Sequence, residues 1–506
     1  MKCTNCGASL SDSAKFCPEC GTKVVRELFC AECGTKLAAG TKFCPECGTK
    51  VGGSAASAPK AAKESYPKDN GSSKWLTIED GVLVECDREA EGVVIIPEGV
   101  TEIGEDVFVG CEKITEIVIP ASVETIDDSF NYHKSLRAFT VAGGNKEFKS
   151  VDGVLYSKDG KTLSSYPCGK EDESFTVPDG VTKIDSFGAN ESLVSVKLPD
   201  SLEKIGDSAF CDCEALESIT LPDSLEEIGD SAFSGCKALE SIKIPASVTE
   251  IVSNAFSWCE ALCSIAVASG NEEYKSVDGV LYSKDGKTLL SYPSGKEDES
   301  FTVPDGVTKI DDSAFYDCNA LESITLPASI TKIGKYAFYE CNALESIKLP
   351  DGVKEIGDSA FRGCEALESI KLPDGVKKIG DSAFYGCEAL ESITLPASIT
   401  KIGEYALSCE SLKQVRYEGT TDEWEEVEQG EGWLCETQVK KVRCSDGFGE
   451  LSENAFGDDD EDEDEEPDTN DSEDDEIDTN DSEDDEIDTN DSEDWDEEEE
   501  EGDEAD

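Results

Sequence analysis

A phrase of 23 residues recurs along the middle of this 506-residue chain and limits the folds open to it. The phenylalanines of the phrase recur at that spacing in two runs: Phe210, Phe233 and Phe256, then Phe315, Phe338, Phe361 and Phe384. A period of roughly 20–30 residues is typical of a solenoid, in which each unit buries its apolar face only against its neighbours. Such a chain offers a long surface and no enclosed pocket, so the sequence constrains the architecture more tightly than the partner.

One copy of the phrase, residues 217–239 (ESITLPDSLEEIGDSAFSGCKAL), indicates how a unit folds. The run SITL alternates polar and apolar residues, which predicts a short strand with Ile219 and Leu221 facing the core. Leu225 and Ile228 follow at helix-like spacing. Stacked copies would place equivalent residues in columns and build one continuous core from short parallel strands.

A column of cysteines accompanies the phrase. Its members are Cys111, Cys213, Cys236, Cys259, Cys318, Cys341, Cys364, Cys387 and Cys409. A metal or redox role competes with a structural one, but nothing in the sequence brings four of these thiols to one point. We therefore expect a small, buriable and weakly hydrogen-bonding side chain at a bend of each unit. Cys211 and Cys263 lie off the column and have no interpretation from the sequence.

Residues 1–50 hold eight of the 23 cysteines, in four Cys-x2-Cys pairs. The pairs are Cys3 and Cys6, Cys17 and Cys20, Cys30 and Cys33, and Cys44 and Cys47. Two thiolate-bearing turns that face one another form a tetrahedral S4 site, which suits Zn²⁺. We predict two structural zinc ions, each closed by four ligands with no open position for catalysis. Redox chemistry of the pairs and iron binding are the alternatives.

The segments KCTNCGASLSDSAKFCPECGTKV and FCAECGTKLAAGTKFCPECGTKV resemble the bacterial double zinc ribbons found at the N-termini of many multidomain proteins. The resemblance implies a small docking or regulatory module, and some relatives bind nucleic acid. Residues 1–74 hold 11 Lys and Arg against seven Asp and Glu. Two Zn(Cys)4 centres, each of charge about −2, would cancel that excess. Since no patch of interleaved arginine and aromatic residues is visible, nucleic-acid binding is the minor interpretation.

The whole chain is strongly acidic, with 114 acidic against 44 basic residues and a formal net charge of −70. From Asp458 onward, 34 of 49 residues are Asp or Glu and none is Lys or Arg. Mutual repulsion and scarce apolar residues predict a disordered tail, with weak association of divalent cations but no defined cation site. The overall charge argues against binding of the whole protein to nucleic-acid phosphates or anionic lipid membranes.

The register IxxIGDSAFxxCxxLxxIxLP resembles the BspA-type leucine-rich-repeat family of bacterial and protist proteins, from residue 93 to about 447. The likeness includes a block at 151–184 that recurs almost verbatim at 277–310, and a closing unit that ends at Trp424. The resemblance implies a leucine-rich-repeat solenoid of short parallel strands with an irregular or short helical convex side. It also implies protein binding, since family members are mostly surface proteins that bind other proteins or adhere to surfaces.

These observations divide the chain into four parts. The predicted parts follow in this order: tandem zinc ribbons at 1–50, a flexible linker at 51–74, a capped BspA-type solenoid at 75–447 with two irregular hairpin-bearing repeats at 138–174 and 266–300, and a disordered acidic tail at 448–506.

The position after the column phenylalanine varies between units. Tyr316, Tyr339, Arg362 and Tyr385 occupy it in successive units, with Trp258 nearby. We call these five residues the aromatic ridge. Because Tyr, Trp and Arg dominate binding hot spots, the ridge is a candidate protein-binding surface. Packing between turns is the competing interpretation.

The sequence offers no recognisable catalytic arrangement. His133 is the only histidine, it stands beside Tyr132 in a repeat turn, and no paired nucleophile accompanies it. Neither a phosphate-binding nor a dinucleotide-binding glycine motif occurs. We therefore predict a non-enzymatic protein-interaction scaffold that uses the leucine-rich-repeat surface and a zinc-stabilised docking module. The alternative is a regulatory or nucleic-acid-associated protein that acts through the ribbons.

The N-terminus bears on where the protein works. Met1 and Lys2 run straight into Cys3 without an apolar signal segment, and no stretch approaches the roughly 20 apolar residues of a membrane span. Many free thiols together with zinc-type spacing favour a reducing cytoplasm. A surface adhesin exported by a non-standard route is the alternative.

Overall fold

The structure, a computed structural model, describes residues 28–29, 36–37, 66–127, 130–252 and 254–457. Near the N-terminus, β1 (Leu28–Phe29) and β2 (Lys36–Leu37) pair antiparallel. The eight predicted zinc ligands, residues 51–65 of the predicted linker and residues 458–506 of the tail predicted at 448–506 lie outside the described residues. Two residues at the start of that predicted tail, Phe448–Gly449, form the strand β38. The fold described below is that of the repeat region.

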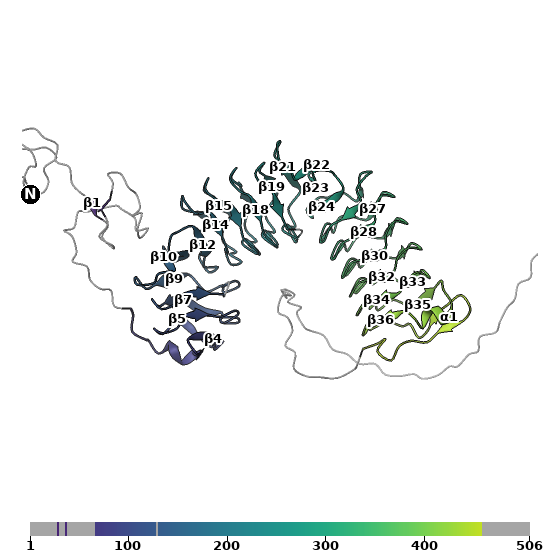
Figure 1. Cartoon of the computed structure of the whole chain (residues 1–506), viewed down its shortest axis with the longest axis horizontal. Helices are drawn as coiled ribbons and strands as arrows, with labels where there is room; N and C mark the ends of the chain where they lie inside the picture. The colour runs from purple at the N-terminus through teal and green to yellow at the C-terminus, as the bar shows by residue number, and fades with distance from the viewer. Residues whose placement is uncertain (1–27, 30–35, 38–65, 128–129, 253, 458–506) are drawn as a thin grey trace, which may run out of the picture. The chain divides into compact units, whose positions relative to one another are not determined.

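Each regular turn of the repeat region contributes two short strands, and equivalent strands of successive turns form two columns (Figure 1). The strands of the first column are β5 (Glu91–Ile95), β7 (Lys113–Ile119), β9 (Ala138–Val141), β13 (Ser174–Thr176), β15 (Ser195–Lys197), β17 (Ser218–Ile219), β19 (Ser241–Ile244), β21 (Ser264–Val267), β25 (Ser300–Thr302), β27 (Ser323–Thr325), β29 (Ser346–Lys348), β31 (Ser369–Lys371), β33 (Ser392–Leu395), β35 (Gln414–Tyr417), β37 (Val442–Arg443) and β38 (Phe448–Gly449).

The second column follows the same order along the chain. Its strands are β3 (Leu76–Glu79), β4 (Val82–Cys86), β6 (Glu102–Ile103), β8 (Thr125–Ile126), β10 (Phe148–Val151), β11 (Val154–Ser157), β12 (Thr162–Ser165), β14 (Lys183–Ile184), β16 (Lys204–Ile205), β18 (Glu227–Ile228), β20 (Glu250–Ile251), β22 (Tyr274–Val277), β23 (Val280–Ser283), β24 (Thr288–Ser291), β26 (Lys309–Ile310), β28 (Lys332–Ile333), β30 (Glu355–Ile356), β32 (Lys378–Ile379), β34 (Lys401–Ile402) and β36 (Glu428–Gln429).

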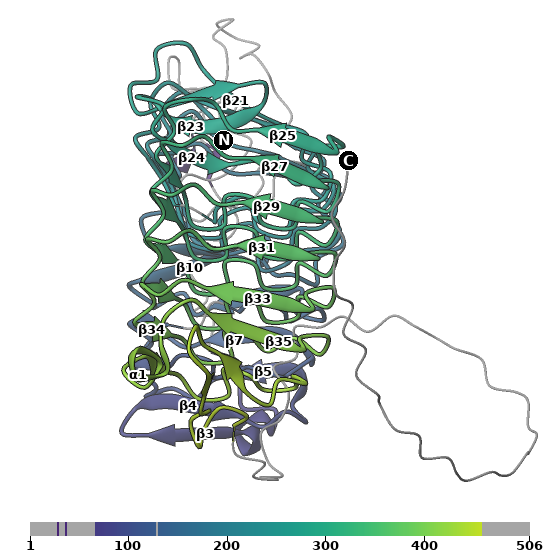
Figure 2. The ribbon, with the colours of Figure 1, turned by 90° about the vertical axis from the view of Figure 1, so that its right-hand side faces the viewer.

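Register aligns equivalent residues of neighbouring turns. Figure 2 shows β25, β27, β29, β31 and β33 lying side by side in chain order. Between β29 and β31, Ser346 pairs with Ser369 and Lys348 with Lys371, in parallel. The predicted solenoid of short parallel strands is confirmed, and its columns are those expected from the 23-residue period.

The irregular side of each unit consists of turns rather than helices. Ile228, expected at helix-like spacing from Leu225, lies instead in the two-residue strand β18. In the segment that follows, the backbone is left-handed at Ser231 (φ +49°) and at Gly235 (φ +70°). Two left-handed residues within five positions prevent a right-handed helix. In the described part of the chain, helical turns occur only at η1 (Ser72–Trp75) and at α1 (Thr421–Trp424) in the closing unit.

The column phenylalanines stack through the core. Ring centroids lie 5.0 Å apart between Phe315 and Phe338, 5.1 Å between Phe338 and Phe361, and 5.3 Å between Phe361 and Phe384. All four side chains are fully buried. Burial of one such side chain contributes about 1.5–3 kcal/mol, and a favourable ring pair adds about 0.5–1.5 kcal/mol. The stack therefore stabilises each turn through both of its neighbours.

The column cysteines join the same core. The Sγ atoms of Cys236 and Cys364 each donate to the carbonyl oxygen of the column phenylalanine one turn earlier, at 3.1 Å. Burial raises the pKa of both thiols well above that of an ordinary cysteine. A protonated, buried thiol is a poor nucleophile and a poor metal ligand, so the column has a structural role.

We expect alkylation of the native protein at pH 8 to distinguish the exposed Cys263 from the buried column cysteines. Cys263 is exposed and should react with iodoacetamide within minutes, whereas Cys236 and Cys364 should react only after denaturation. Mass spectrometry of tryptic peptides measures the sites. Labelling of the column cysteines in the native protein at the rate of Cys263 would contradict the structural role.

Two hairpin blocks interrupt the regular turns. In the first, β10, β11 and β12 pair antiparallel in succession, and β12 then pairs in parallel with β14. In the second, β22, β23, β24 and β26 repeat that arrangement. Each block therefore leaves the solenoid as a hairpin and rejoins its second column, which keeps the following turns in register.

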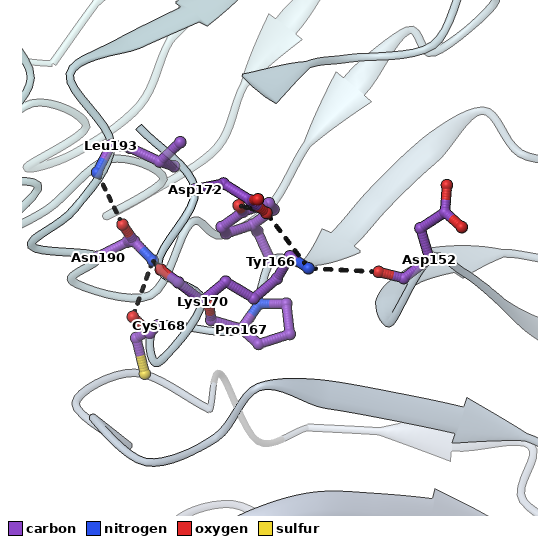
Figure 3. A network of polar contacts seen from close by, with 8 residues as sticks. All are labelled: Asp152, Tyr166, Pro167, Cys168, Lys170, Asp172, Asn190 and Leu193. Atoms are coloured by element: carbon purple, nitrogen blue, oxygen red, sulfur yellow. Dashed lines mark hydrogen bonds and ion pairs between the residues drawn. The ribbon is translucent and has the colours of Figure 1, made fainter. Parts of the chain in front are cut away.

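A buried amide secures the first block (Figure 3). Asn190 lies where a regular unit has its column cysteine, 23 residues before Cys213. Its Nδ2 donates to the carbonyl oxygens of Cys168 at 2.8 Å and Lys170 at 2.9 Å, and its Oδ1 accepts from the Leu193 N–H at 2.9 Å. A single thiol cannot supply two donors and an acceptor, which explains asparagine at this turn.

Candidate protein-binding surface

The aromatic ridge lies on the turn that follows the second strand of each unit. Tyr316, Tyr339, Arg362 and Tyr385 each come directly after a fully buried column phenylalanine and are themselves partly exposed. Trp258 is 37% exposed. The turn thus directs the phenylalanine into the core and places its successor at the surface.

The five side chains form one continuous row. The rings of Trp258 and Tyr316 meet edge-on at 5.6 Å, and those of Tyr316 and Tyr339 stack at 4.6 Å with an interplanar angle of 17°. The guanidinium carbon of Arg362 lies 5.7 Å from the centre of the Tyr339 ring and 4.8 Å from that of Tyr385. All five candidate residues are therefore brought together, with a cation between two aromatic rings.

The second hairpin block explains how Trp258 meets Tyr316. Ser294, in the turn that closes the block, donates through Oγ to the carbonyl of Cys259 at 2.8 Å. In the same turn, the Tyr292 ring stacks on the column phenylalanine of the next unit at 5.3 Å. The block thus contributes one turn between those of Trp258 and Tyr316, and the two rings meet across that turn.

The backbone at Trp258 is left-handed, with φ +55°. Glycine occupies the equivalent position in three regular units, at φ +70° (Gly235), +72° (Gly363) and +69° (Gly386). A bulky residue in this region costs on the order of 1–3 kcal/mol, and such strain is concentrated at functional sites. Asp212, Asp317 and Glu340 are also left-handed at the equivalent position, at φ +54°, +57° and +53°, so this conformation belongs to the turn and is not specific to Trp258.

Sequence reasoning missed Tyr336, which widens the ridge. Its side chain is 42% exposed and its ring lies 5.8 Å from that of Tyr339. The available signal was the departure of its unit from the consensus, with KYAF in place of DSAF. Tyr132 was also missed: it precedes the first hairpin block as Trp258 precedes the second, and its hydroxyl donates to Asp212 at 2.8 Å.

Carboxylates flank the ridge. Burial, together with repulsion from Glu340, raises the pKa of Asp317 to about 6. The Asn319 amide donates to the Asp317 carboxylate, and within the described part of the chain Asp317 forms no ion pair. Burial also raises the pKa of Tyr316 and of Tyr339, so both phenols stay protonated at neutral pH. The ridge therefore combines ring edges, hydroxyl groups and negative charge.

The outward positions of the first-column strands form a second exposed surface. Ser346 and Ser369 form one row, and Lys348 and Lys371 form the next. These side chains are short or flexible and include no aromatic ring, which is typical of a solvated face. The strand face is therefore the weaker candidate.

The single histidine of the chain lies in the core of the repeat region. His133 lies three residues after Phe130, in the place of a column cysteine, and is 6% exposed. It packs edge-on against Phe108, with ring centroids 6.5 Å apart, and burial lowers its pKa to about 4. No cluster of three or more His, Cys, Asp or Glu residues in the described ranges could hold a metal ion.

All eight cysteines of residues 1–50 lie outside the described residues, so the zinc sites remain a prediction from the sequence. A search of the described residues finds no helix with both the length and the apolar character that crossing a bilayer requires.

Comparison with known families gives two matches. A profile described as the BspA type leucine rich repeat region matches in six copies, over residues 73–151, 182–277, 294–350 and 331–461. A profile described as a double zinc ribbon matches residues 3–48, which include all eight predicted ligands. No curated protein matches the chain.

Several solved structures are similar to this chain. A leucine rich cell surface protein from Faecalibacterium prausnitzii is 35% identical, with 69% of this chain and 93% of that chain covered and a TM-score of 0.53. A leucine-rich repeat protein from Eubacterium ventriosum is 23% identical, with 71% and 88% covered and a TM-score of 0.40. The pneumococcal vaccine antigen PcpA is also 23% identical, with 75% and 88% covered and a TM-score of 0.42.

Proposed function

Because the chain belongs to the BspA-type leucine-rich-repeat family, we propose that its repeat region is a non-enzymatic scaffold that binds another protein. The aromatic ridge is the proposed contact surface. The observation that supports this most is the unbroken row of partly exposed rings from Trp258 to Tyr385, with Arg362 held between two of them.

Physical reasons favour this row as a binding surface. Its rings are already ordered by stacking, so little side-chain entropy is lost when a partner covers them. Tyr, Trp and Arg are also the residues most often found at interface hot spots. Stacked turns hold the row on a rigid frame, which fixes the spacing between contacts.

Replacing Tyr316, Tyr339 and Tyr385 with serine should weaken binding of the protein partner by about 100-fold, since each lost hot-spot ring costs on the order of 1 kcal/mol or more. Pulldown with the full chain from its native source, mass spectrometry of the captured proteins, and titration of the recovered partner measure the effect. The variant should stay folded, with a circular dichroism spectrum like that of the parent chain, although loss of the stacked pair lowers its melting temperature.

A matched control replaces Lys348 and Lys371 with serine on the strand face, where both side chains are exposed. This variant should retain binding, and restoring phenylalanine at the three tyrosine positions should recover most of it. Unchanged capture by the tyrosine-to-serine variant would remove the ridge as the contact surface.

We infer that residues 1–50 bind two structural Zn²⁺ ions and serve as a docking module. The double zinc ribbon match and the eight cysteines in four Cys-x2-Cys pairs support this. Four thiolates around each ion are a closed, tetrahedral donor set that would join two turns without an open catalytic position. Binding of nucleic acid through the ribbons is the rival, and it would show as salt-dependent retention of the full chain on immobilised nucleic acid.

We propose the cytoplasm as the site of action, because none of the 15 cysteines in the described residues forms a disulfide. The Faecalibacterium relative is described as a cell surface protein, which supports the rival location. Protease treatment of intact cells distinguishes them: the cytoplasmic protein stays intact until lysis, whereas a surface protein is degraded from outside.

A further inference from the structure

The surroundings of the aromatic ridge are rich in carboxylates. Glu260, Glu365 and Glu388 each follow a column cysteine, and all three are exposed. Lys237, which lies near the first of them, is already paired, with its Nζ 3.2 Å from a Glu214 oxygen and 3.9 Å from a Glu260 oxygen. Within the described part of the chain, the carboxylates beside the ridge therefore outnumber the nearby cations, Lys237 and Arg362.

Asp317 and Glu340 occupy the centre of this negative region. They come directly after Tyr316 and Tyr339, on consecutive turns, and the Asp317 N–H donates to the Tyr339 carbonyl at 2.9 Å. Neighbouring turns thus present two carboxylates beside one pair of stacked rings. Repulsion from Glu340 contributes to the raised pKa of Asp317, and a cation from outside that lies beside Asp317 would relieve that repulsion.

The ridge already accommodates one guanidinium group, that of Arg362, between Tyr339 and Tyr385. Tyr316 and Tyr339 stack directly at 4.6 Å and leave no such gap. An incoming cation would therefore lie along the ring edges, where the phenol oxygens and the carboxylates of Asp317 and Glu340 can accept its hydrogen bonds.

We propose that the occupant of the aromatic ridge is a basic segment of the partner protein, whose arginine or lysine groups contact Asp317 and Glu340 while its apolar carbons cover the ring edges. This proposal rests on the proposed function and specifies the chemistry of the partner. Charge complementarity is its argument: an acidic chain with carboxylates in excess at this surface attracts a cationic segment and repels an acidic one.

The proposal predicts a characteristic pH dependence. The pKa of Asp317 is about 6, raised by burial, by Glu340 and less by Glu260, while Asn319 and Lys237 act in the opposite direction. Above pH 6 the carboxylate is charged and attracts the cation. As the pH falls from 7.5 through 6 to 5.5, Asp317 takes up a proton and binding should weaken.

The test uses the full chain and a fluorescent 12-residue peptide of alternating arginine and serine, with a glutamate–serine peptide for comparison. Fluorescence anisotropy at 150 mM salt should show that the double variant Asp317→Asn with Glu340→Gln binds the arginine peptide about tenfold more weakly at pH 7.5. The variant should also lose the weakening between pH 7.5 and 5.5. A photoreactive arginine peptide should cross-link to residues of the ridge.

The control variant, Asp351→Asn with Asp374→Asn, removes the same charge at two exposed loop positions and should bind like the parent chain. Equal affinity of both double variants would overturn the proposal, as would cross-links found only in the acidic tail. The proposal would also be overturned if a lysine-reactive cross-linker joins the chain's own lysines at 60, 63 and 68 to the ridge and the arginine peptide does not reduce this cross-linking. If the tyrosine variant loses its partner while the Asp317 variant keeps it, the scaffold function stands and only the basic partner is refuted.

Discussion

Replacing Phe361 with alanine should lower the free energy of unfolding of the repeat region by about 3–5 kcal/mol, the usual cost of deleting a buried phenylalanine side chain. The ring is fully buried and lies 5.1 Å from Phe338 and 5.3 Å from Phe384, so its loss opens a cavity and breaks two stacked pairs. Urea denaturation followed by circular dichroism measures the change as a lower midpoint.

A matched control is Phe448→Ala in the closing hairpin, because that side chain is 63% exposed. It should change the free energy of unfolding by less than about 1 kcal/mol. Equal effects of the two substitutions would contradict a core built on the phenylalanine column. Since each turn is stabilised only by its neighbours, loss of Phe361 should also raise hydrogen exchange in the adjacent turns more than in distant ones.

Much of this fold could be predicted from the sequence because the repeat is a periodic constraint. Phenylalanine and cysteine recur every 23 residues at the positions equivalent to Phe361 and Cys364. Only a stack of equivalent turns buries every one of these side chains. The local conformation after each second strand was harder. Ser231 and Gly235 adopt left-handed backbone there, and a serine with positive φ carries no sequence signal that separates it from a helical serine.

Substitutions within a column were also hard to predict. Asn190 and His133 each occupy the place of a column cysteine, three residues after the column aromatic, but neither has the thiol by which the column is recognised in the sequence. Structure supplies the reason for Asn190, since the turn of the first hairpin block presents several carbonyl groups that need donors. For His133 the structure shows burial against Phe108.

The candidate site could be predicted in part, because successive units at one position must lie side by side in a solenoid. That argument places Tyr316 next to Tyr339. It cannot place Trp258 next to Tyr316, since the second hairpin block separates them and only the paired strands show that the block adds a single turn. Nor can a sequence reveal that Asp317 is partly buried near Glu340, which raises its pKa to about 6.

Removing zinc should unfold residues 1–50 and leave the repeat region intact. The apparent free energy of zinc binding in such structural sites is about 10–16 kcal/mol, and most of it is folding free energy because the ligands are not assembled without metal. The purified chain should carry two zinc ions, measured by plasma mass spectrometry. A strong chelator at pH 7 should release both and expose eight reactive thiols, counted by alkylation.

A double cysteine variant distinguishes zinc bound at the two predicted sites from metal bound incidentally. Cys6→Ser with Cys20→Ser should leave one zinc ion per chain, since each unit of two pairs holds its own ion, whereas Cys263→Ser in the repeat region should leave two. The melting transition of the repeat region should be the same in both, because the core of that region is built from residues between 83 and 455. Visible absorption from iron, or recovery of the eight cysteines as disulfides, would contradict zinc binding. Loss of both ions from the variant at Cys6 and Cys20 would show that the two ribbons share one cooperative site.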